Sequence, residues 1–413
     1  MKRFSNILAV VFVLAALVGC ENSVDTPTPN PGLDPNAKYI LFDVGIEESR
    51  GVALNSADHE DFTQFSIYGY AYITGTRWNA WKTIAKPNVF DEVPEKVVKA
   101  GSYFSYVEDG GNLKTWDEGD GRYSFFAVYP EASVGTSLGS IAYPVNSTTE
   151  GVPYVTYTRL NDATKMVDLM TGAHIDPTYS ENGSYVSFDM EHRLAAVDVV
   201  ALNHYEFDHD SDPITPEKHV TIRITKLDVK FDNLLYTSAD IYLDKVGIKV
   251  TPTVRRPEYK PENSAVDAVT YTILADSEAY YDVPPNNEDK NHRNISADRE
   301  KTMFFIPQEM DSTTDATLEK TDIKATVTGT FEKWYDEDGD GTLDTQIMKE
   351  YDEDGNLIDE DGKFSINNQI KFNRHLEESY RYNVRLTFTS AAVSITVLTA
   401  EKWVDVPIYH EFH

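Results

Sequence analysis

Cysteine is nearly absent from the chain: Cys20 is the single cysteine among 413 residues. An internal disulfide is therefore excluded, and stability must come from the packing of side chains. Hydrophobic residues make up 41% of the sequence, which is enough to build sizeable cores in a chain of this length. By the usual size of domains, the chain has room for about two.

Long apolar runs are also scarce, and none after the N-terminus is long enough to span a membrane. The one such run, residues 7–18, follows a short basic head and leads into the string LVGC at residues 17–20. Small residues before a cysteine at this place are typical of a lipoprotein signal. We expect residues 1–19 to be a signal peptide and Cys20 to carry acyl chains that hold the mature chain to a membrane. Residues 20–38, rich in Pro, Asn, Thr and Asp, are predicted to form a flexible lipidated tether.

Positive charge is in short supply. The chain has 37 Lys and Arg residues against 68 Asp and Glu, so its formal net charge at pH 7 is −31. A chain this acidic is repelled by nucleic acid and by anionic lipid head groups, so neither is expected as a partner. Acidic residues are spread along the sequence, which favours a general role in solubility over one charged face.

Motifs of catalytic sites are missing as well. The sequence has no HExxH zinc motif, no phosphate-binding P-loop and no GxGxxG dinucleotide motif. Cys20 is committed to lipid and is not available as a nucleophile. We therefore expect a protein that is not an enzyme and that needs no organic cofactor.

The sequence does have many short segments with the alternating pattern of β-strands. Short runs rich in Val, Ile, Thr, Tyr and Phe alternate apolar and polar residues, and clusters of Gly, Pro, Asn and Asp separate them. The runs are residues 40–46, 65–73, 123–129, 186–188, 194–201, 220–224, 241–250, 268–274, 303–306, 323–331, 380–388 and 393–398. No long helical period competes with them. This pattern predicts an all-β protein with two β-sandwich domains in tandem, residues 39–205 and 215–413, divided by a polar stretch.

Five groups of strings follow one another in a fixed order along the chain. They are ILFDVGIEESRG (residues 40–51), FSIYGYAYI (65–73), WDEGDGRYSFFAVYP (116–130), VSFDMEHRLAAVDV (186–199), and ESYRYNVRLTF (378–388) with VSITVLTAEKWVDV (393–406). Behind a lipobox, this order resembles the fimbrillin-like lipoproteins of Bacteroidales, the subunits of type V pili. The chain departs from that pattern where Glu378-Ser379 replaces the usual Gly-Lys, and in a long acidic insertion, residues 336–362.

The resemblance implies two transthyretin-like β-sandwich domains and a structural or adhesive subunit of a surface fibre. The precursor would be an outer-membrane lipoprotein, and a trypsin-like protease would cut it after an arginine near the first strand. The implied partners are other pilin subunits, because loss of the first strand opens a groove that a strand from another subunit fills. Two alternatives remain open: the anchor subunit of the same pilus, which keeps its lipid, and a monomeric surface lipoprotein that binds glycans.

The residues themselves fit such strand exchange. The bond between Arg50 and Gly51 lies in a polar stretch with glycine, where proteases cut exposed loops, although most loop arginines are merely solvated. At the C-terminus, apolar residues alternate in two phases, which predicts a turn or bulge between two short strands. These candidate donor-strand residues are Val393, Ile395, Val397, Val404, Val406 and Ile408. They fit equally a donor to a neighbour and an ordinary sheet edge.

The acidic insertion has the spacing of a calcium loop. Asp336, Asp338, Asp340 and Asp344 stand at positions 1, 3, 5 and 9 of such a loop, and a glycine stands at the turn position 6. Position 12 is Ile347 where an EF-hand has a glutamate, so we expect weak Ca²⁺ binding or a solvated acidic hairpin. The string YDEDGNLID that follows is typical of a hairpin.

Overall fold

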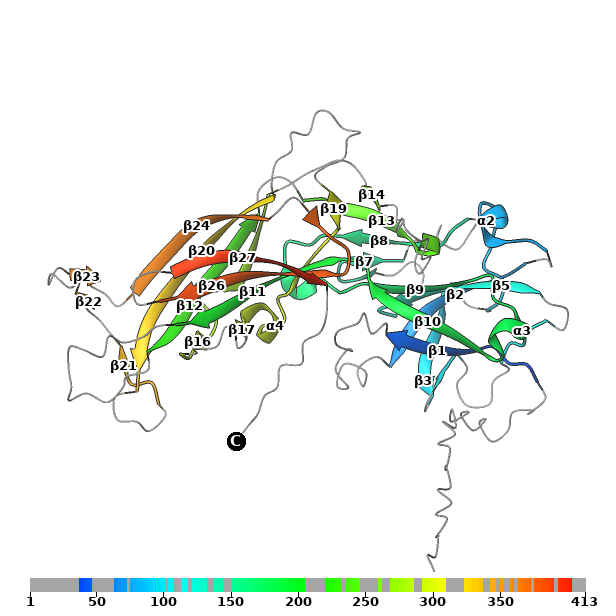
Figure 1. Cartoon of the computed structure of the whole chain (residues 1–413), viewed down its shortest axis with the longest axis horizontal. Helices are drawn as coiled ribbons and strands as arrows, with labels where there is room; N and C mark the ends of the chain where they lie inside the picture. Colours follow the sequence, from blue (N-terminus) through cyan, green and yellow to red (C-terminus); the bar gives the residue numbers. More distant parts are fainter. Residues whose placement is uncertain are drawn as a thin grey trace, which may run out of the picture. The chain divides into compact units, whose positions relative to one another are not determined.

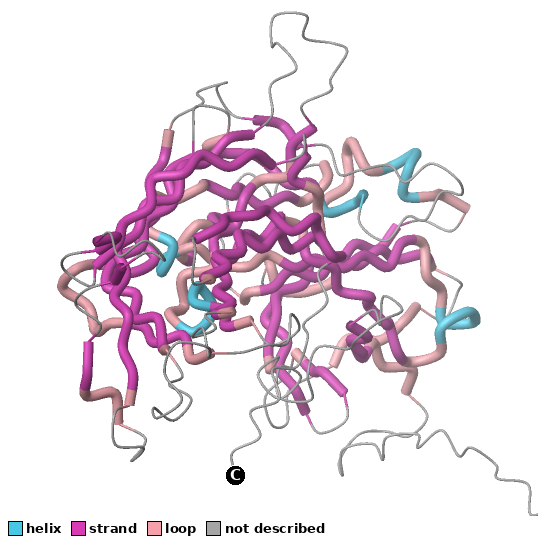
Figure 2. The backbone as a smooth tube through the Cα atoms, turned by 60° about the vertical axis from the view of Figure 1, so that its left-hand side comes forward, coloured by secondary structure: helices cyan, strands magenta, loops and turns pink. Residues whose placement is uncertain are grey.

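The computed structural model of the chain is shown in Figure 1. It describes residues 37–46, 63–72, 75–91, 93–100, 103–106, 113–117, 121–131, 137–143, 151–204, 220–231, 235–245, 259–261, 268–285, 292–309, 323–336, 342–346, 350–351, 357–359, 363–372, 375–389 and 393–402. Strands dominate these segments, as Figure 2 shows. The prediction of an all-β protein is confirmed.

Strands from the first half close into a barrel. Neighbours follow the order β1 (Leu41–Ile46), β10 (Tyr185–His192), β9 (Met170–Ile175), β5 (Arg122–Tyr129), β2 (Gln64–Tyr72), β3 (Glu95–Ala100) and β4 (Tyr103–Ser105). All neighbours are antiparallel except β1 and β10, which run parallel along the whole of β1. On its other side, β1 meets β4 through one pair, Phe42 and Phe104. β1 therefore lies between β10 and β4 and completes the ring, which leaves this sheet without a free edge.

Two further sheets pack face to face as a β-sandwich. One has the order β17 (Arg293–Asn294), β11 (Ala195–Asn203), β26 (Tyr380–Phe388) and β27 (Val393–Lys402), with β18 (Met303–Phe305) also on β11. The other has the order β15 (Val269–Leu274), β12 (Thr221–Phe231), β20 (Ile323–Tyr335) and β21 (Thr345–Gln346), with β16 (Tyr281–Val283) on β12 and β24 (Lys363–Phe372) on β20. Rings meet between the sheets: the centroids of Phe231 and Phe305 lie 4.9 Å apart, and those of Phe331 and Phe388 lie 5.0 Å apart.

Smaller elements complete the fold. One sheet has the order β14 (Tyr259–Pro261), β13 (Ser238–Tyr242), β8 (Tyr154–Thr158), β7 (Ile141–Ala142) and β6 (Ser137–Leu138). Two further sheets have two strands each: β19 (Gln308–Glu309) with β25 (His375–Leu376), and β22 (Glu350–Tyr351) with β23 (Leu357–Asp359). The helical elements among the described residues are single turns: α2 (Trp78–Trp81), η2 (Ala163–Lys165), α3 (Tyr179–Asn182), η3 (Leu243–Lys245) and α4 (Ile295–Asp298). In the part of the chain that the structure describes, no helix is long and apolar enough to cross a membrane.

Two hydrophobic cores explain why β2 is apolar in both of its phases. Phe65 and Ile67 point into the barrel, where they join the smaller core. Tyr68, Tyr70 and Tyr72 point the other way, into a larger core that continues through the sandwich. Successive side chains of a strand face opposite sides of the sheet, so a strand that lies between two cores must be apolar on both.

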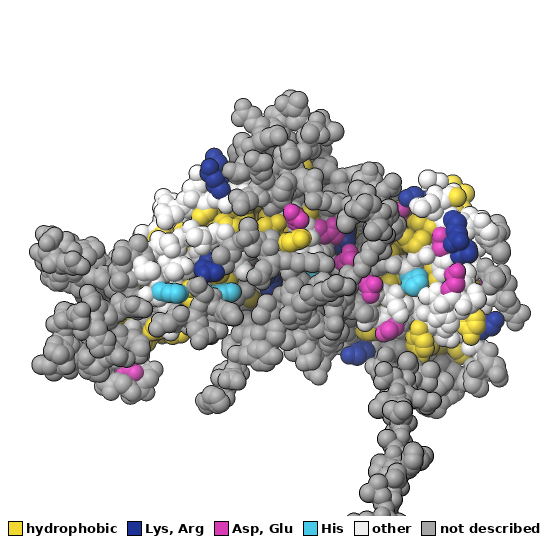
Figure 3. Space-filling view, viewed as in Figure 1, with side chains coloured by type: hydrophobic (Ala, Val, Ile, Leu, Met, Phe, Trp, Pro, Cys, Tyr) yellow, Lys and Arg dark blue, Asp and Glu magenta, His cyan; other side chains and the backbone are white. Residues whose placement is uncertain are grey.

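On the face shown in Figure 3, acidic and basic side chains are interspersed among polar ones.

The predicted division at residues 205 and 215 stays a prediction, but the ladders add a feature that it did not include. β11, placed by sequence at the end of the first domain, pairs in parallel with β26 from Ala196–Arg381 to Asn203–Phe388. β8 also pairs with β13, across the proposed boundary. The predicted sandwich for residues 39–205 is likewise not confirmed, because β1 joins β10 to β4 and closes that sheet into a ring.

Candidate functional site

The first strand is held mainly by its backbone ladder with β10. The register runs from Leu41 opposite Tyr185 to Ile46 opposite Met190, and the N–H of Leu41 donates to the carbonyl of Ser184 at 2.9 Å. The β4 side contributes the single pair at Phe42. Removal of β1 would therefore leave a long unpaired edge on β10 and a short one on β4, which is the kind of opening that another strand fills.

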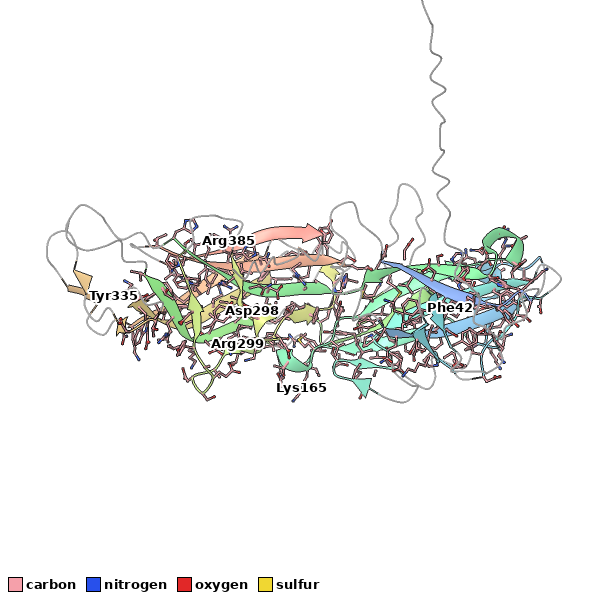
Figure 4. The ribbon with its side chains drawn as sticks, turned by 90° about the horizontal axis from the view of Figure 1, so that it is seen from below. Phe42, Lys165, Asp298, Arg299, Tyr335 and Arg385 are labelled. Carbon is pink, nitrogen blue, oxygen red and sulfur yellow. The ribbon has the colours of Figure 1, made fainter. Side chains whose placement is uncertain are left out.

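Phe42 is the central side chain of this strand. It is fully buried inside the barrel, and four aromatic rings surround it. Its ring centroid lies 6.1 Å from Phe90, 5.8 Å from Tyr106, 5.6 Å from Phe125 and 5.8 Å from Phe188. We call these four rings the aromatic slot. Figure 4 labels Phe42 on β1, among the side chains of the barrel.

The residues just before β1 form a second attachment. The carbonyl of Lys38 accepts a hydrogen bond from the N–H of Trp116 at 2.8 Å, and the N–H of Ile40 donates to the carbonyl of Lys114 at 3.0 Å. The ammonium of Lys38 also lies 4.7 Å from the ring centroid of Tyr179. Ile40 is fully buried in the same core as Phe42. Backbone hydrogen bonds therefore hold this segment both before β1, at residues 38–40, and along β1 itself. Its apolar side chains face the core.

Burial raises the pKa of the Tyr106 hydroxyl in the aromatic slot, and a hydrogen bond from the backbone of Lys114 opposes that shift in part. The N–H of Lys114 donates to this hydroxyl at 2.7 Å. Tyr106 is therefore neutral in the folded protein over a wider pH range than in the unfolded chain. Since the pKa is raised, its contribution to stability is complete below an ordinary tyrosine pKa of about 10 and is lost as the pH rises beyond it.

Replacing Tyr106 with phenylalanine should lower by one the number of tyrosines that ionise only when the chain unfolds. The same change removes the hydroxyl that Lys114 contacts, so it should cost about 1 kcal/mol of unfolding free energy at neutral pH. Absorbance titration at alkaline pH, together with urea unfolding at pH 7, measures both quantities. An unchanged count of late-ionising tyrosines would contradict the burial of Tyr106 in the slot.

The C-terminal candidate residues divide into two sets. Val393, Ile395 and Val397 lie in β27, half-buried against the larger core, while Ser394 and Thr396 are exposed. β27 pairs antiparallel with β26 and lies at the end of the order of its sheet, so in the described segments no strand is hydrogen-bonded to its outer edge. The register shifts between Leu398 and Glu401, which fits the irregularity that the change of phase predicts.

Several predicted site residues lie outside the described segments. They are Cys20, Arg50, Gly51, Asp338, Asp340, Val404, Val406 and Ile408. Asp336 and Asp344 are described, and the hairpin predicted in YDEDGNLID is confirmed by the pairing of β22 with β23. No group of three or more His, Cys, Asp or Glu side chains within the described ranges is arranged to hold a metal ion. Because two of the four aspartates are outside these ranges, the calcium site stays a prediction.

The chain contains one string typical of a catalytic serine. Residues 135–139 read GTSLG, which matches the GxSxG pattern of serine hydrolases. In those enzymes the serine sits on a tight turn from a strand into a helix. Here Ser137 is exposed within β6, and the chain turns at Gly139 and Ser140 into β7. This strand-turn-strand setting is not that of a nucleophile elbow.

Comparison with known proteins identifies the architecture. No protein-family model and no curated protein sequence matches the chain. Among solved structures, a fimbrial protein from Bacteroides vulgatus is similar at a TM-score of 0.52 and 19% sequence identity, over 89% of this chain and 99% of that one. The chain shares the fold of that fimbrial protein.

Two further solved structures resemble it at lower scores. A protein from Bacteroides ovatus, provisionally assigned to cell adhesion, has a TM-score of 0.42 and 12% identity over 90% of this chain and 99% of that one. A fimbrial assembly protein from Parabacteroides distasonis has a TM-score of 0.33 and 11% identity over 87% of this chain and 95% of that one.

Proposed function

We propose that this chain is a structural or adhesive subunit of a cell-surface type V pilus, assembled by exchange of β-strands. The observation that carries the proposal is β1, a short N-terminal strand that closes a barrel with its apolar face inside. The shared fold with a fimbrial protein supports it. The proposal keeps the two tandem transthyretin-like domains expected from sequence, and it assigns no catalytic activity.

The precursor in this proposal is an outer-membrane lipoprotein anchored through Cys20. A trypsin-like protease cuts between Arg50 and Gly51, beyond the end of β1, and the mature subunit becomes part of the surface fimbrium. A strand from another pilin subunit then occupies the place of β1. The proposal assigns the donor role in turn to the C-terminal residues Val404, Val406 and Ile408, because the side chains of 393–397 already pack against their own core.

Maturation can be tested at the proposed bond. Protein recovered from assembled surface fibres should begin at Gly51, and Arg50→Ala should leave a lipidated precursor that does not enter fibres, because the protease has lost its basic side chain. Mass spectrometry of the N-terminal peptide and electron microscopy of the cell surface measure these outcomes. Arg50→Lys is the matched control, since a protease that is trypsin-like accepts lysine.

The alternatives give different results in the same experiment. Fibre-associated protein that still begins at a lipidated Cys20 would support the anchor subunit and contradict cleavage at Arg50. A surface protein that stays monomeric in cells that make both the chain and its protease would contradict the pilus proposal and favour the glycan-binding lipoprotein.

A further inference from the structure

We infer that the groove around β1 selects its occupant by one aromatic side chain, held where Phe42 lies. The inference rests on the proposed strand exchange and names the chemistry of the incoming strand. That strand is an extended segment with the pattern aliphatic–x–aromatic–x–aliphatic, in which the aromatic ring enters the aromatic slot. In β1 this pattern is Ile40, Phe42 and Val44.

The slot is built for a ring. Phe90 and Phe125 meet Phe42 at interplanar angles of 61° and 71°, which are edge-to-face contacts, and Phe188 lies at 33°. Edge-to-face and offset contacts are the arrangements that aromatic rings prefer. The slot rings also support one another, because Phe90 and Tyr106 lie 4.9 Å apart at 65°. A β-branched aliphatic side chain has neither the length nor the flat shape to reach all four rings, so it would leave a void.

The positions on either side of the aromatic residue accept a wider range of side chains. Val44 is only half-buried, and Asp43 faces solvent. Ile40 is fully buried, and other aliphatic residues of similar volume can replace it with a small loss. Discrimination between candidate strands should therefore be concentrated at the position of Phe42.

The backbone fixes where that ring must stand. The ladder with β10 extends along all of β1, whereas β4 offers one pair. An occupant that takes its register from β10 runs parallel to it, with its aromatic residue opposite Val186 and beside Phe104. A shift by one residue would turn the ring out of the barrel, and a shift by two would place it beside the wrong neighbours.

The tail of this chain does not match the pattern well. Residues 404, 406 and 408 are Val, Val and Ile, so the three successive positions of one phase are aliphatic. A second copy should therefore fill the slot less tightly than β1 does. A partner strand with a ring at the middle position is the occupant that the groove favours.

Peptide exchange tests this inference. A full-length variant with a specific protease site placed within residues 47–62 is cut, and fluorescent peptides of residues 38–46 compete with the resident strand. The peptide with Phe42→Ala should bind at least about 100-fold more weakly than the unchanged peptide, and the one with Phe42→Leu about 10-fold more weakly. Asp43→Ala is the matched control and should stay within about 3-fold. The tail peptide, residues 402–413, should bind more tightly once Val406→Phe is introduced.

The outcomes separate the inference from the proposed function. If unchanged and Phe42→Ala peptides both bind, with affinities within about 3-fold, selection by the slot is refuted and strand exchange stands. If neither the unchanged peptide nor any other enters the cut protein, strand exchange itself fails, and the inference fails with it. A ranking of phenylalanine over leucine over alanine, with no effect at Asp43, supports both.

Discussion

Replacing Phe42 with alanine is expected to lower the free energy of unfolding of the uncut chain by about 3–5 kcal/mol. The side chain is fully buried, and its removal leaves Phe90, Tyr106, Phe125 and Phe188 around an empty space. Phe125 and Phe188 are held by the ladders of β5 and β10, and Phe90 and Tyr106 pack against each other at 4.9 Å, so these rings cannot collapse into the void without strain. Urea unfolding, followed by fluorescence, measures the loss.

Two neighbouring positions serve as controls for this substitution. Asp43→Ala removes an exposed side chain from the same strand and should change stability by less than about 0.5 kcal/mol. Val44→Ala removes a half-buried side chain and should fall between the two. A loss below about 1 kcal/mol for Phe42→Ala would mean that β1 does not contribute a central ring to the barrel, and the proposed groove would lose its main feature.

The existence of β1 could be predicted from the sequence, but its neighbours could not. The alternation in residues 40–46 is a local pattern, and it is enough to place Phe42 on an inward face. The parallel partner β10 lies far along the chain, and parallel pairing has no turn that announces it in sequence. The same reason applies to β11 and β26, whose pairing joins strands that sequence reasoning assigned to different domains.

Some strands were not predicted because their composition is unlike that of a strand. β24 has Asn367, Asn368 and Gln369 in its middle, and these side chains are exposed on a strand that pairs, among the described strands, only with β20 at a sheet edge. β9 contains Gly172, where an added Cβ would lie 2.9 Å from the Sδ atom of Met190. Tight packing there favours glycine, and glycine weakens the pattern by which a strand is recognised.

The aromatic slot shows the same limit at the level of the site. Aromatic residues in residues 123–129 and 186–188 predict core positions, and both Phe125 and Phe188 are indeed fully buried. Phe90 and Tyr106 stand outside any predicted strand, in segments with little regular pattern. That all four converge on Phe42 depends on the closure of the barrel, which no local pattern specifies.

Deletion of residues 403–413 is expected to abolish entry of the subunit into fibres while leaving a folded monomer. The described ladder between β26 and β27 ends at Lys402, opposite Tyr380, so the deletion removes none of its pairs. The donor proposal gives Val404, Val406 and Ile408 their partners only in a neighbouring subunit. Circular dichroism and thermal unfolding of the purified chain measure folding, and electron microscopy of the cell surface with detection of the subunit in fibres measures assembly.

Substitutions within the tail sharpen this test. Val404→Asn, Val406→Asn and Ile408→Asn together remove the apolar face of one phase and should block assembly as the deletion does, because a polar face cannot occupy an apolar groove without loss of hydrogen bonds to water. The matched control, Asp405→Asn with Tyr409→Ser, changes the opposite phase and should assemble normally. If the deleted chain misfolds, the tail is a structural edge of its own domain. If the deleted chain folds and still enters fibres, residues 403–413 are not the donor strand. The end of β27 would then be the next candidate for the donor.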